Sequence, residues 1–230
     1  MRHLKEEIRV LKAVLFDLGE TLVRIADVAE IHQRILDAHG IHRTREDIVA
    51  ANRTAEKKLS LELMKTMSDE FWVKRNNLFL EQLGVFGRED LARFISEHWW
   101  DYSDVALYPD TKETLNELKQ RGLKLGVITN GLQSDVRKIM SKIRFDSCFF
   151  DVVVTVSTAN QMKPEQEIFR YALEALNVTA SEALFVGDTV EYDYEGAKKA
   201  GMKALLIDRH GRIAGDYEKI HDLREILFLV

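Results

Sequence analysis

Short apolar runs alternate with amphipathic stretches through the second half of the chain. The apolar runs have the length and β-branched content of buried strands, and one more occurs near the N-terminus. These predicted strands lie at 13–16, 123–129, 151–156, 183–187 and 203–207. The predicted helices of this half lie at 111–121, 134–143, 164–176 and about 193–200. Strands separated by helices favour parallel βαβ units with helices on both faces of one sheet.

The segment 24–104 has a different pattern. Its apolar residues recur at helical spacing, as at Ile31, Ile35 and Leu36, and it contains no convincing strand. The predicted helical stretches lie at 27–39, 45–67, 69–83 and 88–100. We therefore expect a doubly wound, Rossmann-like α/β core of residues 1–23 and 105–230, with an all-helical insertion at 24–104.

Composition narrows the classes of function. Among 230 residues, 33 Lys and Arg stand against 38 Asp and Glu, so nucleic-acid binding, which needs a basic face, is not expected. The single cysteine, Cys148, cannot form an internal disulfide, and its Phe neighbours suggest a buried position. No uncharged run exceeds 11 residues and the N-terminus is charged, so neither a membrane span nor a signal peptide is expected. These features favour a cytoplasmic protein and leave the oligomeric state open.

Polar residues follow four of the predicted strands. Asp17 comes directly after the first strand, Thr129 ends the second, and Lys163 lies in the loop after the third. Asp188 follows the fourth, with Asp193 five residues later. Ligands of open parallel sheets bind at the carboxyl ends of the strands. Helix capping accounts for one such residue, but it is a poor explanation for four in this order.

The same residues carry a resemblance to a known family. FDLGETL matches in part a first motif Asp-x-Asp-x-Thr, and Thr129 matches a second. Lys163 followed by Pro164 matches a third, and Gly187–Asp188 with Asp193 matches a fourth. Over nearly its whole length the chain resembles the haloacid-dehalogenase-like hydrolases, most of which are Mg²⁺-dependent phosphatases. Segment 24–104 resembles the family's helical cap.

The resemblance implies a role for each motif residue. Asp17 would attack phosphorus and form an aspartyl-phosphate. Thr129 would hydrogen-bond a phosphate oxygen, and Lys163 would supply positive charge to offset that of the phosphate. Mg²⁺ would be held by Asp17, the carbonyl of Gly19 and Asp188, with Asp193 as a ligand or behind one. Backbone N–H groups around four residues would cradle the phosphate: Leu18, Gly19, Asn130 and Gly131. The implied substrate is a small phosphorylated metabolite, such as a sugar or triose phosphate.

Gly19 departs from the family pattern. Phosphatases of the family usually have a second Asp there, which protonates the leaving group. The adjacent Glu20 is a possible substitute, although we favour the interpretation that it faces solvent or caps the turn. A 2-haloacid dehalogenase lacks this Asp and needs no metal, so it is an alternative, as is a weakly active phosphate-binding regulatory protein. The presence of Asp188, a metal-motif residue, favours the phosphatase.

Overall fold

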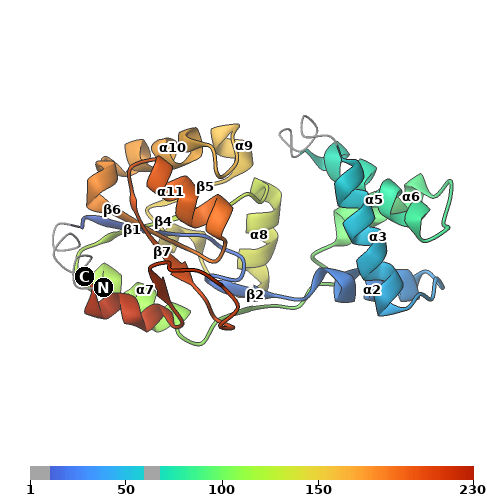
Figure 1. The fold of residues 1–230 in the computed structure, drawn as a ribbon, viewed down its shortest axis with the longest axis horizontal. Helices are drawn as coiled ribbons and strands as arrows, with labels where there is room; N and C mark the ends of the chain where they lie inside the picture. The colour runs from blue at the N-terminus through green and yellow to red at the C-terminus, as the bar shows by residue number, and fades with distance from the viewer. Residues whose placement is uncertain (1–10, 60–67) are drawn as a thin grey trace. The chain divides into compact units, whose positions relative to one another are not determined.

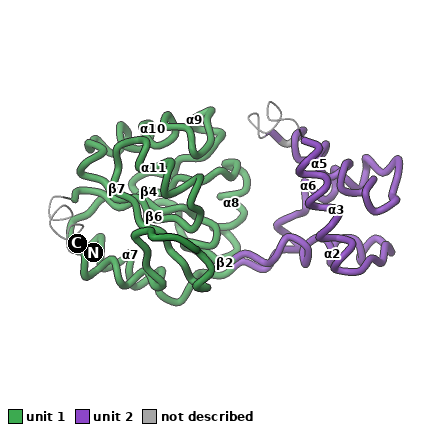
Figure 2. The backbone as a smooth tube through the Cα atoms, viewed as in Figure 1, with its two compact units in different colours: residues 1–24, 106–230 green, residues 25–105 purple. Residues whose placement is uncertain are grey.

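The computed structural model describes residues 11–59 and 68–230, which divide into two compact units. Of these described residues, those up to 24 and from 106 to 230 form one unit, and those between 25 and 105 form the other (Figure 2). The chain passes between the units along two short strands, β2 (Val23–Ile25) and β3 (Val105–Leu107), which pair in a small sheet. Each unit has its own apolar core.

The larger unit is built on a six-stranded sheet with the order β5-β4-β1-β6-β7-β8, and its strand pairs are parallel. The strands are β1 (Ala13–Phe16), β4 (Lys124–Ile128), β5 (Val152–Val154), β6 (Ala183–Gly187), β7 (Lys203–Ile207) and β8 (Lys219–Ile220). β1 is central, and all four of its residues are inaccessible to solvent. Central parallel strands are buried on both faces, which is why they are apolar at every position. The predicted α/β class is confirmed.

Helices cover both faces of this sheet (Figure 1). On one side lie α9 (Val156–Ala159), α10 (Gln166–Leu176) and α11 (Gly196–Lys199). On the other side, α7 (Thr111–Gln120) packs against the C-terminal 3₁₀ helix η5 (Leu223–Phe228), while α8 (Gln133–Lys142) follows β4. On the α10 side of the sheet, the rings of Phe169 and Phe185 meet edge to face, 5.3 Å between centroids.

The smaller unit is helical. It contains α2 (Val28–Ala38), α3 (Arg45–Lys58), α5 (Asp69–Gln82) and α6 (Glu89–His98). Three of these begin at a side chain that accepts a backbone N–H of the first turn, namely Asp27, Thr44 and Ser68. Buried Arg75 donates to the ring of His32, and burial followed by the Arg75 charge lowers the pKa of His32 to about 3. His32 is therefore a neutral core residue.

Several local expectations were wrong. The helix predicted over 45–67 ends at Lys58, and 60–67 lie outside the described residues. Pro164 precedes α10 instead of opening it, after a cis peptide bond with Lys163. Cys148 is exposed, because it lies in a short 3₁₀ turn at the surface.

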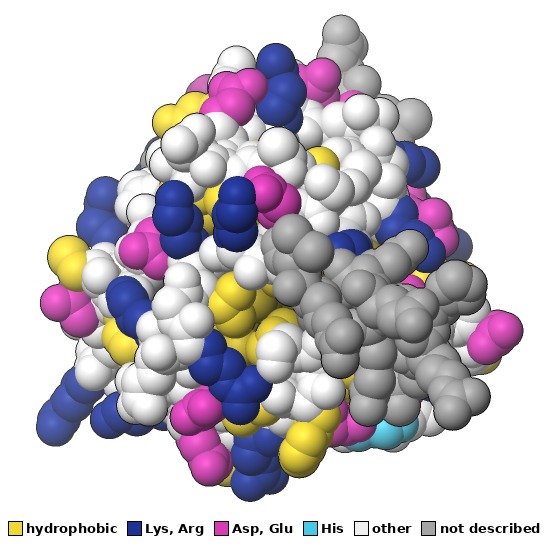
Figure 3. Space-filling view, turned by 90° about the vertical axis from the view of Figure 1, so that its left-hand side faces the viewer, with side chains coloured by type: hydrophobic (Ala, Val, Ile, Leu, Met, Phe, Trp, Pro, Cys, Tyr) yellow, Lys and Arg dark blue, Asp and Glu magenta, His cyan; other side chains and the backbone are white. Residues whose placement is uncertain are grey.

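The surface carries charges of both signs. On the face shown in Figure 3, basic and acidic side chains are interspersed over the described residues. Among the helices of residues 11–59 and 68–230, none combines the length and apolarity that crossing a bilayer demands.

Candidate active site

Adjacent parallel strands bring the motif residues to one edge of the sheet. β1 lies between β4 and β6, with Phe16 in register with Val127 and with Val186. Asp17 extends this pattern, because its N–H donates to the Val186 carbonyl at 2.9 Å. The residues that follow these three strands therefore share the carboxyl edge of the sheet. Asp17 and Thr129 are both nearly buried there.

Lys163 reaches the same edge from the loop before α10. Its Nζ lies 2.6 Å from Asp17 Oδ1 and 2.6 Å from Asp193 Oδ1, and its side chain is only 3% exposed. Burial lowers the pKa of Lys163, but the two carboxylates raise it by more, so the net shift is upward. Lys163 is therefore a permanent positive charge inside the site.

Asn130 holds Lys163 in place through its side chain. Its Oδ1 accepts the Lys163 N–H at 2.7 Å, and its Nδ2 donates to the Lys163 carbonyl at 3.1 Å. A side-chain amide thus pairs with a peptide group 33 residues away. We expected only the backbone of Asn130 to matter. The signal in the sequence is the amide itself, which offers a donor and an acceptor next to Thr129.

Three carboxylates meet at this edge. Asp17, Asp188 and Asp193 each place an oxygen within 4.8 Å of the oxygens of the other two. Burial, followed by the charges of its two neighbours, raises the pKa of Asp188 to about 7. Burial also raises the pKa of Asp17 to about 6, against the opposing effect of Lys163. Three carboxylates supply the oxygen ligands that Mg²⁺ prefers. Binding of the cation would displace the protons that the raised pKa values retain on Asp17 and Asp188.

Asp193 is directed inward by the turn that follows β6. It lies in a single π-helical segment, η4 (Val190–Glu195), a rare conformation that often marks functional sites. Its Oδ2 accepts the Thr189 N–H at 2.9 Å and the Thr189 hydroxyl at 2.6 Å. A Cβ on Gly187 would lie 2.4 Å from Asp193 Cγ, so the glycine is required by this close approach. Thr189 was not among the expected site residues.

The turn after β1 is closed by its own backbone. The Leu18 carbonyl accepts the N–H groups of Leu22 and Val23, and Gly19 forms an isolated β-bridge with Val23.

The Thr129 hydroxyl accepts a hydrogen bond from a neighbouring backbone group, because the Gly131 N–H donates to its Oγ1 at 3.2 Å. The threonine hydroxyl therefore has its own hydrogen available for another acceptor.

Glu20 has a partner inside the larger unit. Its Oε2 accepts the Tyr108 hydroxyl at 2.8 Å, and its backbone has a φ of 54°, in the left-handed region. Burial and this bond raise the pKa of Tyr108, so the phenol stays protonated. We expected Glu20 to face solvent or to cap the turn, and its side chain is half-buried. The side chain is turned toward Tyr108.

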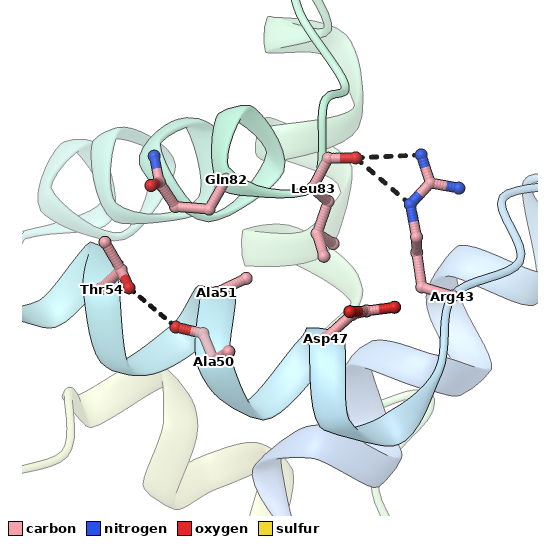
Figure 4. A pocket seen from close by; sticks show the side chains of 7 residues that line it. All are labelled: Arg43, Asp47, Ala50, Ala51, Thr54, Gln82 and Leu83. Carbon is pink, nitrogen blue, oxygen red and sulfur yellow. Dashed lines mark hydrogen bonds between the residues drawn. The ribbon is translucent and has the colours of Figure 1, made fainter.

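A hollow of about 390 Å³ lies in the helical unit, between α3 and the end of α5 (Figure 4). Arg43, one of its lining residues, donates twice to the Leu83 carbonyl and once to that of His42. Figure 4 shows Gln82 and Leu83 on one side and Asp47, Ala50 and Thr54 on the other. None of the lining residues belongs to the four motifs, so the carboxylate edge is the candidate active site.

Known proteins resemble the chain over most of its length. A family model described as haloacid dehalogenase-like hydrolase matches residues 11–201. The glyceraldehyde 3-phosphate phosphatase of Methanocaldococcus jannaschii is 29% identical over 216 residues, which are 93% of this chain and 90% of that protein.

Solved structures agree with this family. A phosphatase from Thermococcus onnurineus is 28% identical with a TM-score of 0.60, covering 95% of this chain and 99% of its own. YfnB of Bacillus subtilis, solved with magnesium bound, has the same fold at 20% identity and a TM-score of 0.77, covering 96% and 98%. The chain therefore belongs to the haloacid dehalogenase-like hydrolases.

Proposed function

We propose that the protein is a Mg²⁺-dependent phosphatase that hydrolyses small phosphate monoesters of the sugar or triose phosphate type. The observation that carries this proposal is the pairing of buried Lys163 with Asp17 beside two further carboxylates. The similarity to a glyceraldehyde 3-phosphate phosphatase supports the substrate class.

Asp17 is the proposed nucleophile. Attack by one of its oxygens on phosphorus forms an aspartyl-phosphate and releases the alcohol, and water then cleaves the acyl phosphate. Nucleophile and substrate are both anions, so nearby positive charge must offset their repulsion. Lys163 provides such a charge at 2.6 Å from Asp17. Asn130 keeps that ammonium in position through two hydrogen bonds to the Lys163 backbone.

Asp17, Asp188 and the carbonyl of Gly19 are the proposed ligands of Mg²⁺. When bound, the cation neutralises charge where phosphate and carboxylate meet. Asp193 is engaged by Lys163 and Thr189, which favours a place behind the ligands over direct coordination.

Thr129 and nearby backbone groups are the proposed phosphate contacts. The Thr129 hydroxyl would donate to a phosphate oxygen, since its own oxygen already accepts the Gly131 N–H. The N–H groups of Leu18, Gly19 and Asn130 would hold further oxygens. The helical segment 24–104 is proposed as the cap that excludes water and selects the alcohol part of the substrate.

Gly19 favours a second candidate, the 2-haloacid dehalogenase, because a halide leaves without a proton. The cluster of Asp17, Asp188 and Asp193 argues against it, since such a reaction has no use for a cation site. Complete loss of catalysis, as in a phosphate-binding regulatory protein, is disfavoured by the buried Lys163–Asp17 pair.

A substrate panel tests these alternatives. Phosphate release is measured over sugar phosphates, triose phosphates and p-nitrophenyl phosphate, with Mg²⁺ or with EDTA, and halide release is measured from 2-haloacids. We expect phosphate release that EDTA removes and Mg²⁺ restores. Halide release that ignores EDTA would identify a dehalogenase. Binding of phosphate compounds without turnover would identify the regulatory protein.

A further inference from the structure

Arg209 joins three segments of the larger unit that are distant in the sequence. Its Nη2 and Nε donate to the Thr21 carbonyl at 2.6 and 3.2 Å, in the turn after β1. Its Nη1 and Nη2 donate to the two carboxylate oxygens of Asp110, at 2.9 and 3.2 Å, where α7 begins. Arg209 itself follows β7, and its side chain is 9% exposed.

The guanidinium is held on several sides. The Tyr108 ring stacks on it, with 3.6 Å between Cζ and the ring centroid. Asp110 also accepts the Leu223 N–H at 2.8 Å, which ties it to η5, packed along α7 (Figure 1). Two-point pairing combined with ring stacking suits the planar fork of arginine and not the ammonium of lysine. We call Arg209, Asp110 and Tyr108 the Arg209 clamp.

The clamp acts on the turn that carries the nucleophile. Two further bonds hold the next carbonyl, that of Leu22, from the Tyr108 N–H and the Thr111 hydroxyl. Thr21 is fully buried, and its hydroxyl faces Asp188 Oδ1 at 3.5 Å. A shift of the Thr21 peptide would therefore move the Thr21 hydroxyl at Asp188 and the Asp17–Gly19 backbone together.

We propose that Arg209 is a positioning residue of the metal site, which fixes the Thr21 carbonyl so that Asp17, Gly19 and Asp188 keep the arrangement that Mg²⁺ requires. This inference rests on the proposed function. Mg²⁺ demands nearly ideal octahedral geometry, so a small displacement of the turn costs affinity. Loss of an outer-shell contact typically weakens metal binding about 10- to 100-fold. Thr129 and Lys163 lie on other segments, so their proposed phosphate contacts do not depend on the clamp.

The test compares Arg209→Lys with Arg121→Lys. Arg121 joins α7 to the same C-terminal segment, through the carbonyls of Leu227 and Val230, but does not contact the turn. Mg²⁺ binding to the EDTA-treated protein is measured by calorimetry, without substrate. We expect the Mg²⁺ Kd of Arg209→Lys to rise about 10-fold or more, and that of Arg121→Lys to stay at the wild-type value. In Arg209→Lys, high Mg²⁺ restores kcat for p-nitrophenyl phosphate.

Asp110→Asn keeps the test valid if Arg209→Lys does not fold. It retains an acceptor for the Leu223 N–H while removing the charge that orients Arg209. Circular dichroism and thermal unfolding identify the folded variants. A wild-type Mg²⁺ Kd in the folded clamp variants would overturn the inference and leave the proposed function standing. A wild-type protein that does not bind Mg²⁺ would overturn both.

Discussion

Lys163 and Asp17 form an ion pair buried at the carboxyl edge of the sheet, with Nζ 2.6 Å from Oδ1 and side chains that are 3% and 13% exposed. Charges removed from water in this way are costly unless they are paired. Lys163 is shared with Asp193, so one cation serves two carboxylates. The remaining negative charge is the physical reason that the site favours a divalent cation, and it underlies the predictions that follow.

Asp17→Asn should abolish phosphate release while leaving the fold intact. The amide keeps the shape of the side chain and an acceptor for Lys163, but it loses the nucleophilic charge. Phosphate release and the thermal unfolding curve are measured on the same preparation. Substantial turnover by the folded variant would mean that the nucleophile is another residue.

Mg²⁺ binding should strengthen as the pH rises from about 5.5 to 8. The raised pKa values, about 6 for Asp17 and about 7 for Asp188, mean that protons occupy the site at the lower end of this range. Metal binding must expel them, so the Kd falls by up to about 10-fold per pH unit for each proton released. Calorimetry in buffers of different ionisation enthalpy counts these protons. A Kd that is independent of pH would exclude the two carboxyl groups as ligands.

Asp188→Asn should stabilise the metal-free protein at pH 8 and have less effect at pH 5. A carboxyl whose pKa is raised to about 7 in the folded state destabilises that state above pH 7. The penalty fades as the pH falls toward the ordinary value of 3.8, where both states are protonated. Each kcal/mol corresponds to about 2–4 °C in Tm for a chain of this size.

Thermal unfolding with EDTA, at both pH values, checks this prediction. Added Mg²⁺ provides the control, because it should raise the Tm of the wild type more than that of the variant. A variant that melts below the wild type at pH 8 in EDTA would show that Asp188 does not carry the expected penalty.

Gly19→Asp should accelerate alkyl phosphates more than p-nitrophenyl phosphate. Without an acid at position 19, an alkoxide leaves with little help, whereas p-nitrophenolate is stable as an anion. A general acid contributes about 10²–10⁴-fold, which sets the upper limit of the gain. The ratio of kcat/KM for the two ester classes is the measurement. An unchanged ratio in the folded variant would indicate that proton transfer to the leaving group is not limiting.

Glu20→Gln should leave that same ratio at its wild-type value. The Glu20 carboxylate accepts the Tyr108 hydroxyl, and glutamine retains an acceptor oxygen for this bond. Tyr108→Phe is the matched variant, because it removes the donor and keeps the ring that stacks on Arg209. A selective loss of alkyl-ester turnover in Glu20→Gln would instead make Glu20 the substitute acid.

The sequence alone determined the class of the fold and the order of its chemistry along the chain. The runs predicted at 183–187 and 203–207 coincide with β6 and β7 because a strand buried on both faces is apolar throughout. A polar residue at the carboxyl end of such a strand must lie at the edge of the sheet where open parallel sheets bind their ligands. The two-residue strand β8 escaped prediction, since Lys and Ile form no periodic pattern.

The side chains that hold the site residues in place became evident only in the folded structure. Asn130 hydrogen-bonds the backbone of Lys163, 33 positions away in the sequence, and Arg209 hydrogen-bonds the carbonyl of Thr21, 188 positions away. Glu20, expected to face solvent or cap the turn, accepts the hydroxyl of Tyr108, which lies 88 positions away. Hydrophobic periodicity reports only neighbours one or two helical turns or strand pleats away. Contacts between distant segments depend on strand order and parallel register, which exist only once the sheet has formed.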